Sequence, residues 1–312
     1  MTNIGDFVEG VVRSDRRSIA RAISYMEDGH TEIKKEIMEK LYSHCGKAHV
    51  VGITGPPGIG KSTLIGNISV LLAQKGMTVP VLAVDASSPY SGGSLLGNRI
   101  RMQENLFNYG IYMRSLANRG ARGGLSESCM GAVNVLDASG SEIILIETVG
   151  AGQADLDIMN LADTTILVLG PGLGDQIQAI KAGIMEIADL FVINKMDIDG
   201  SYFAMKDIEE VISMDDPRGY KRRVTGTSAT DHAGYDELVG TILDHGRYLS
   251  GEGTIGRKRF LMGARWILES EIGRIIIDPA MDAIKKKGTD RNPYVLAEKI
   301  ISQLNAEISK EL

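Results

Sequence analysis

Cysteine is scarce in this sequence, which places only Cys45 and Cys129 among its 312 residues. Two cysteines in a chain of this length do not form the disulfide framework that is typical of small secreted proteins. We therefore expect two free thiols in a reducing compartment. Cys45 lies close to His44 and His49 in the sequence, but zinc needs a further ligand at a suitable spacing and the sequence offers none. A zinc site is not expected there.

Long apolar runs are also absent. No stretch reaches the roughly 20 apolar residues that a membrane-spanning helix needs, so no membrane partner is predicted. Residues 1–10 contain Asp6 and Glu9 and no apolar run, which is not the pattern of a signal peptide. We expect a cytoplasmic protein, or one in an organelle matrix that has lost a targeting segment.

An excess of positive charge is missing too. The formal net charge is −6, which argues against a nucleic-acid partner. Hydrophobic residues make up 43% of the chain and charged residues 24%, the balance of an ordinary globular protein. The sequence can therefore bury a sizeable core.

The order of apolar and polar segments predicts three regions. Residues 1–47 are predicted to be helical, because apolar residues such as Ile19, Ile23 and Met26 recur at three- and four-residue spacing. Residues 48–250 alternate strands with helices. The strands are expected at 49–54, 79–84, 111–114, 143–146, 164–169, 190–193 and 223–227, with a helix at 61–74. Strands this apolar predict a doubly wound, mainly parallel α/β sheet that helices cover on both faces.

Residues 251–312 show no further strand pattern. We expect one helix over residues 260–277 and another over 293–312, separated by a break at Asp278-Pro279. These helices carry more apolar surface than a lone hairpin can bury. They either pack back on the core or form a dimer contact.

A glycine-rich segment follows the first predicted strand and precedes the first helix of the α/β region. It matches the phosphate-binding pattern G-x-x-x-x-G-K-[ST], in which backbone N–H groups and the helix N-terminus face phosphate oxygens. Lys61 is expected to reach the β and γ phosphates, Ser62 to ligate magnesium and Thr63 to contact the α phosphate. The predicted cradle consists of Gly55, Pro56, Pro57, Gly58, Ile59, Gly60, Lys61, Ser62 and Thr63.

A second motif, Asn194-Lys195-Met196-Asp197, closes the strand at residues 190–193. It resembles the N-K-x-D element of GTPases. The Asp197 carboxylate can accept hydrogen bonds from N1–H and the exocyclic amino group of guanine, whereas adenine offers no matching donors. Lys195 can cover the base, and Asn194 can tie the loop to the phosphate cradle. Ser228-Ala229 resembles the backbone element that contacts the guanine O6 atom.

Carboxylates follow two other strands. Asp85 and Glu147 end neighbouring strands, and magnesium prefers such oxygen ligands. Gly150 stands where a backbone N–H can touch the γ phosphate. We expect Lys61, Asp85, Glu147 and Gly150 to serve catalysis. Many GTPases have a glutamine directly after that glycine to orient the attacking water; here Ala151 follows and Gln153 comes later, so intrinsic hydrolysis is predicted to be slow.

Together these motifs resemble the MeaB/ArgK/MMAA group of SIMIBI-class P-loop GTPases over most of residues 10–250. A glutamate that opens the E-x-x-G element is typical of this group. The matching segments are Val84-Asp85-Ala86-Ser87-Ser88-Pro89, Ser91-Gly92-Gly93, Arg99-Ile100-Arg101-Met102, Glu147-Thr148-Val149-Gly150-Ala151-Gly152-Gln153 and Gly172-Leu173-Gly174-Asp175.

The resemblance implies a GTPase chaperone for an adenosylcobalamin-dependent acyl-CoA mutase, chiefly methylmalonyl-CoA mutase. Such proteins gate cofactor loading and protect the mutase from inactivation. They are usually homodimers joined through C-terminal helices. Older descriptions of the family name a kinase of the lysine/arginine/ornithine (LAO/AO) transport system, which would need access to the periplasm; the absence of an export signal disfavours that alternative.

The resemblance also implies three switch segments, at residues 86–124, 150–162 and 170–183. Gln153, Asp175, Gln178 and Lys181 are candidate switch residues in them. The family usually reads Gly-Asp-Arg where this chain has Gly97-Asn98-Arg99. Asn98 still offers a carbonyl oxygen as a metal ligand, but without charge, so either weaker magnesium binding or a weaker activated state is expected.

Arg122 lies in a glycine-rich stretch and has two interpretations. It either faces solvent or acts as an arginine finger that neutralises charge in the transition state.

Two other functions compete with the chaperone. A metal-insertion GTPase shares the glutamate signature, but normally carries histidine tracts or a Cys-x-Cys-Cys motif, and this chain has neither among its five histidines and two cysteines. A small-molecule kinase shares the phosphate cradle, but the N-K-x-D element for guanine disfavours it.

Overall fold

The computed structural model describes residues 4–27, 31–85, 102–117, 124–148, 159–172, 188–213 and 219–273, together with residues 277, 295, 298 and 302. The chain divides into two compact units, residues 1–262 and residues 263–312. No helix among the described residues is long and apolar enough to cross a membrane.

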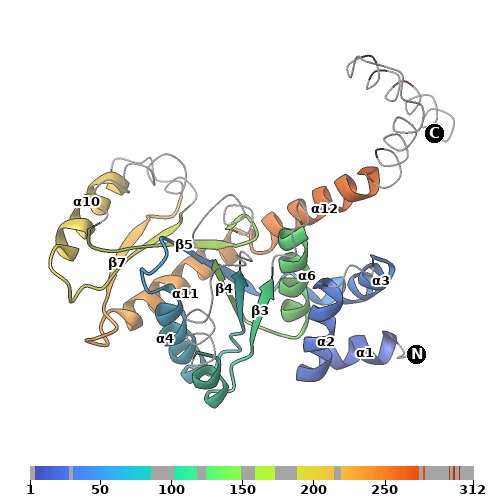
Figure 1. The fold of residues 1–312 in the computed structure, drawn as a ribbon, viewed down its shortest axis with the longest axis horizontal. Helices are drawn as coiled ribbons and strands as arrows, with labels where there is room; N and C mark the ends of the chain where they lie inside the picture. Colours follow the sequence, from blue (N-terminus) through green and yellow to red (C-terminus); the bar gives the residue numbers. More distant parts are fainter. Residues whose placement is uncertain are drawn as a thin grey trace. The chain divides into compact units, whose positions relative to one another are not determined.

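The first unit is built on a seven-stranded sheet in the order β3-β2-β4-β1-β5-β6-β7, in which every pairing is parallel (Figure 1). This confirms the predicted α/β class. Because the strands are parallel, their carboxyl ends meet at one edge. The strands are β1 (His49–Thr54), β2 (Val81–Asp85), β3 (Met113–Ala117), β4 (Ile143–Thr148), β5 (Thr164–Leu169), β6 (Leu190–Asn194) and β7 (Arg223–Thr227).

Two strands begin later than their patterns predict. The prediction places the second strand from residue 79, whereas β2 begins at Val81. Pro80 precedes it and has no N–H to donate to a neighbouring strand. β3 covers Met113–Ala117 rather than residues 111–114, because its pairing with β2 joins Val81 to Met113 and Asp85 to Ala117.

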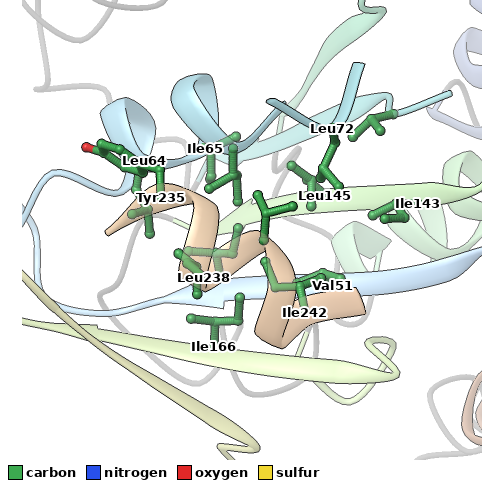
Figure 2. Close-up of a cluster of buried hydrophobic side chains, with 14 of the residues drawn as sticks. Val51, Leu64, Ile65, Leu72, Ile143, Leu145, Ile166, Tyr235, Leu238 and Ile242 are labelled. Carbon is green, nitrogen blue, oxygen red and sulfur yellow. The ribbon is translucent and has the colours of Figure 1, made fainter. Parts of the chain in front are cut away.

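One face of the sheet is covered by α4 (Lys61–Gln74) and α11 (Tyr235–Gly251), which lie side by side (Figure 1). Figure 2 shows their apolar side chains meeting those of β1, β4 and β5. The predicted helix at 61–74 is confirmed at both ends. Among the residues at the centre of this core are Leu64, Ile65, Leu72, Val51, Leu145, Ile166, Leu238 and Ile242.

The alternate side chains of β5 and β6 point to the other face, where α10 (Ser201–Ser213) buries Ile208 against Leu167, Phe191 and Ile193. Further along that sheet α6 (Gly124–Ala138) contacts β3 and β4. The predicted helical N-terminal region forms α1 (Ile4–Val12), α2 (Arg16–Glu27), α3 (Thr31–Leu41) and the short 3₁₀ helix η1 (Tyr42–His44), and α2 packs on α6.

The last helix of the described ranges is α12 (Arg257–Ile272), which begins earlier than the predicted residue 260. Residues 274–276 lie outside the described residues, so the predicted end at residue 277 stays a prediction. The first turn of α12 follows Gly256, whose φ is 73° and whose carbonyl oxygen accepts a 2.9 Å hydrogen bond from the N–H of Phe260. The helix predicted over 293–312 lies outside the described residues, apart from three isolated positions.

A buried ion-pair network fixes the first turn of α12 within the first unit. Arg259 Nη1 lies 2.8 Å from Asp163 Oδ2, and Arg259 Nη2 lies 3.1 Å from Asp137 Oδ2. The three side chains are 4%, 1% and 0% exposed, respectively. Backbone N–H groups also donate hydrogen bonds to both carboxylates. Gly46, Lys47 and Ala48 donate to Asp137, and Val50 and Gly256 donate to Asp163.

Both cysteines carry free thiols. Cys129 is fully buried in α6, and Cys45 donates weak hydrogen bonds to the carbonyl oxygens of Leu41 at 3.5 Å and Asn134 at 3.2 Å. Burial raises the pKa of each thiol to about 12.

Candidate nucleotide-binding site

The motifs singled out in the sequence gather at the carboxyl edge of the sheet. The glycine-rich segment follows β1, Glu147 is the penultimate residue of β4, Asn194 ends β6 and Ser228 follows β7. Ligands of open α/β sheets bind at this edge, outside the ends of the strands. The parallel topology therefore brings together residues that are far apart in the sequence.

The glycines of the first motif are required by the backbone. Gly55, Gly58 and Gly60 have φ values of 149°, 75° and 98°, which disfavour other residues. A Cβ atom at Gly55 would lie 2.2 Å from the carbonyl oxygen of Val168, and one at Gly60 would lie 2.5 Å from Asn194 Nδ2. The segment is thus a tight loop that packs directly on β5 and on the N-K-x-D element. Pro56 is half-buried and Pro57 is exposed at its tip, while Ile59 is buried beneath it.

Lys61 opens α4 and is almost completely buried. Its ammonium group donates hydrogen bonds to the carbonyl oxygens of Gly55 at 2.6 Å and Pro56 at 3.0 Å. The side chain therefore lies across the loop, with its charge at the N-terminus of the helix. Thr63 follows in the same first turn and is exposed.

Ser62 and Glu147 meet next to the loop. The exposed Ser62 hydroxyl donates a hydrogen bond to Glu147 Oε1, although the two residues are 85 positions apart. Asp85 ends β2, which pairs with β4 so that Ala83 lies beside Glu147. The Asp85 side chain lies outside the described residues. Two of the four predicted magnesium ligands are thus in contact, and Asp85 is carried by the neighbouring strand, whereas Asn98 lies outside the described residues.

Asn194 links the phosphate cradle to the last strand. Its buried side chain donates from Nδ2 to the carbonyl oxygen of Ile59 at 2.8 Å and accepts at Oδ1 from the Thr227 hydroxyl at 3.0 Å. Lys195 has a φ of 62° and donates from Nζ to the carbonyl oxygen of Gly58 at 3.0 Å. The N-K-x-D element and the glycine loop therefore form one structure, as the sequence predicts for Asn194.

The Asp197 carboxylate is exposed and is oriented by two hydroxyl groups. Ser228 Oγ donates to Asp197 Oδ1 at 2.8 Å, and Thr230 Oγ1 donates to Oδ2 at 3.2 Å. The Ser228 hydrogen bond is the main reason that the pKa of Asp197 lies below its usual value. Backbone hydrogen bonds of 3.1 Å between Ser228 and Ala233 close the loop, which contains the half-buried Ala229.

Sequence reasoning missed several polar residues of this site. Thr227 orients Asn194, Thr230 orients Asp197, and the Asp231 N–H donates to Ser228 Oγ at 3.1 Å. A signal for them was present, because the Ser228-Ala229 pair stands in the run Thr227-Ser228-Ala229-Thr230-Asp231, which is dense in side chains that form local hydrogen bonds.

The remaining predicted site residues lie outside the described residues. They are Asn98, Gly150, Gln153, Asp175, Gln178 and Lys181, together with the candidate finger Arg122. The three proposed switch segments are described only at residues 102–117, 124, 159–162 and 170–172.

Residues 19–279 match the protein family described as "Methylmalonyl Co-A mutase-associated GTPase MeaB". A protein of Pyrococcus abyssi named "Putative GTPase" is 40% identical over 96% of this chain and 97% of its own length. The GTPase ArgK of Escherichia coli is 31% identical over 86% of this chain and 84% of its own.

An animal protein is similar as well. The mouse protein named "Methylmalonic aciduria type A homolog, mitochondrial" is 34% identical over 83% of this chain and 66% of its own length. Among solved structures, one named as a LAO/AO transport system kinase superposes with a TM-score of 0.71 over 98% of this chain and 99% of its own, at 22% identity. That likeness concerns the fold.

Proposed function

Because this chain belongs to the methylmalonyl-CoA mutase-associated GTPase family MeaB, we propose that it is a GTP-hydrolysing chaperone that gates adenosylcobalamin loading into a B12-dependent acyl-CoA mutase and protects that enzyme. Methylmalonyl-CoA mutase is the client that the family's description favours. GTP is the substrate of the switch, and magnesium is its cofactor.

The observation that carries the nucleotide part of the proposal is the Asn194 side chain. It bridges the Ile59 carbonyl of the phosphate cradle and the Thr227 hydroxyl at the end of β7. Such a bridge fixes the distance between the phosphate-binding loop and the Asp197 carboxylate. A ligand with phosphates at one end and a guanine at the other suits this arrangement, because the oriented carboxylate accepts from both guanine donors.

The residues present also fit magnesium. A hydroxyl and a carboxylate in contact beside a phosphate-binding loop are the hard oxygen donors that this ion takes, usually with substrate phosphates and waters. Ser62, Glu147 and Asp85 would hold it. There it would supply positive charge that offsets the negative charge developing on the phosphates. The Lys61 ammonium adds a second positive charge on the same side of the substrate.

Slow intrinsic hydrolysis is part of the proposal, since no glutamine follows Gly150 directly. Single-turnover hydrolysis of GTP by the isolated full-length protein tests it. We expect a rate far below about 1 per second. A rate of about 1 per second would be closer to that of partner-stimulated GTPases. A rate near that value would contradict a switch that waits for its partner.

Nucleotide selectivity tests the guanine assignment separately. We expect the protein to bind GDP and GTP with magnesium at least 100-fold more tightly than ADP and ATP, because adenine leaves the Asp197 carboxylate without donors. Equal affinity for the two bases would remove the guanine assignment and leave only a phosphate-binding site.

The chaperone role is tested by capturing the tagged protein from extract of its own cells with a non-hydrolysable GTP analogue, with GDP, or without nucleotide. An Asp197→Ala variant serves as the matched control for nucleotide dependence. We expect an acyl-CoA mutase to be recovered in a nucleotide-dependent manner with the unchanged protein. If no B12 enzyme is recovered in any nucleotide state, the chaperone role is contradicted, whereas the GTPase assignment is not affected.

Two further features belong to the same proposal. The C-terminal region 251–312 joins two copies into a homodimer, and the protein acts in the cytoplasm, where its cysteines stay reduced. Exposed apolar residues of α12 support the first point, with Ile267 61% and Leu268 62% exposed. Sedimentation equilibrium of the full chain against one ending at residue 262 tests it, since only the longer chain should dimerise.

A further inference from the structure

A concave site lies at the amino edge of the sheet, the edge opposite the candidate nucleotide site. It is a cavity of about 470 Å³ whose lining includes Asp163, Asp189 and Arg222. These residues directly precede β5, β6 and β7. The lining residues all belong to the first compact unit. The volume lies within the range of about 300–1,000 Å³ that is usual for small-molecule sites.

One wall of this cavity is aromatic. Tyr220 lies before β7, and His245 and Tyr248 stand on α11. The Tyr220 ring centroid is 4.5 Å from that of His245 and 5.3 Å from that of Tyr248, and the His245 and Tyr248 rings are stacked at 6.2 Å. The Tyr220 hydroxyl is buried and has no hydrogen-bond partner among the described residues. This wall therefore offers flat ring surfaces and one buried hydroxyl group, that of Tyr220, which can still form a hydrogen bond.

Positive charge is concentrated at the start of α12. Arg257 and Lys258 form its first turn, are exposed, and have no ion pair within the described part of the chain. The N-terminus of a 16-residue helix adds partial positive charge in the same place. Arg222 contributes a further cation to the lining. An anionic group is therefore attracted to this end of the cavity.

The lining also holds carboxylates, and they differ in availability. Asp163 is engaged by Arg259 at 2.8 Å and by backbone N–H groups, so its charge is already compensated. Asp189 accepts a 2.8 Å hydrogen bond from the Thr165 N–H, and Glu252 is exposed. A carboxylate retains further acceptor positions after one hydrogen bond. The cavity thus suits a ligand that carries amino-group donors as well as an anion.

We propose that this cavity binds a nucleotide-like ligand, a heteroaromatic base that carries a phosphate group. The base stacks on the Tyr220–Tyr248 wall, its exocyclic amino group faces Asp189 or Glu252, and the phosphate faces Arg257 and Lys258. Flat aromatic surface, amino-group acceptors and cations occur together here, and a simple anion would use only the last of these.

Isothermal titration calorimetry with AMP as the probe tests this proposal on the full-length protein saturated with GDP and magnesium. GDP occupies the guanine site, and adenine is a poor match for it, so AMP binding reports on another site. We expect one AMP per chain. Adenosine and inorganic phosphate, titrated separately, are each expected to bind at least tenfold more weakly than AMP.

Single substitutions locate the site. Arg257→Ala and Tyr220→Phe are expected to weaken AMP roughly fivefold or more, and Tyr248→Ala by roughly 5- to 150-fold through lost stacking. Arg247→Ala on the same helix is the matched control, because that exposed arginine pairs with Asp244 and does not line the cavity. GTP hydrolysis should be unchanged in Arg257→Ala and Tyr220→Phe, which also shows that both variants are folded.

Three results would overturn the proposal. The first is no binding heat with AMP at millimolar concentration. The second is phosphate binding as tightly as AMP, which would mean that the aromatic wall contributes nothing. The third is AMP affinity that survives Arg257→Ala and Tyr220→Phe but is clearly higher for the nucleotide-free protein than for the GDP-saturated protein, which would place AMP in the guanine site.

Discussion

Replacing Arg259 by alanine should destabilise the first unit strongly, although this residue is remote from the phosphate loop in the sequence. The substitution removes the only side-chain cation that forms an ion pair with Asp137 and Asp163 among the described residues. Both carboxylates are at most 1% exposed, so water cannot replace the guanidinium without rearrangement. Two buried negative charges are then left close together.

The magnitude follows from the balance of lost and retained contacts. Removing one partner of a buried ion pair costs about 3–5 kcal/mol, because the other charge stays buried and unpaired. Here each carboxylate keeps backbone N–H donors, at 2.7–3.1 Å for Asp137 and at 2.8–2.9 Å for Asp163. Those donors partly stabilise the charge, so we expect the lower end, about 3 kcal/mol at pH 7.

Urea unfolding followed by far-UV circular dichroism measures this loss. Arg247→Ala removes an ion pair whose arginine is 73% exposed and should change the free energy of unfolding by less than about 0.5 kcal/mol. A loss below about 1 kcal/mol at pH 7 for Arg259→Ala would refute the reasoning.

Three other substitutions test the site and the core. Asp197→Ala should weaken GDP binding by about 100-fold or more, because two hydrogen bonds to a charged group are lost. The affinity for ADP should stay unchanged in the same titration. Glu147→Gln keeps the side-chain shape but removes its charge, so the magnesium concentration that half-saturates GTP hydrolysis should rise about tenfold, whereas magnesium-free GDP binding should not change. The buried His49 should make the protein less stable in acid. Burial lowers the pKa of its imidazole in the folded state from 6.5 to about 4, so between these two pH values only the unfolded state binds the proton. As the pH falls from 7 to 5, the free energy of unfolding of the unchanged protein should therefore drop by about 2 kcal/mol more than that of His49→Gln in urea titrations. His44 is exposed, so His44→Gln is the control and should behave like the unchanged protein.

Local signals predicted the existence of every strand of the sheet and the tight glycine-rich loop before α4. The run from His49 to Lys61 passes from β-branched residues through glycines and prolines to a helix, and each step depends on near neighbours. Asn194 was assigned to tie the loops together from its motif alone. Contacts between distant segments could not be predicted in this way. Arg259 lies 96 and 122 residues from its two carboxylates, and nothing in its own surroundings distinguishes it from exposed arginines such as Arg257.

The amino-edge cavity illustrates the same limit. Tyr220, His245 and Tyr248 have no shared motif, and only the packing of α11 beside β7 brings their rings together. The bounds of β2 were also missed by two residues, because a pattern of apolar side chains does not register that Pro80 lacks an N–H.

The protonated thiols have a practical consequence for labelling experiments. The thiolate is the form that reacts with maleimides, and a pKa of about 12 leaves almost none of it at Cys45 or Cys129 near neutral pH. A cysteine introduced at Phe203, which is 73% exposed on α10, can therefore be labelled without removing the native cysteines. A dye at that position would lie on the helix that follows the N-K-x-D element, close in sequence to the candidate nucleotide site.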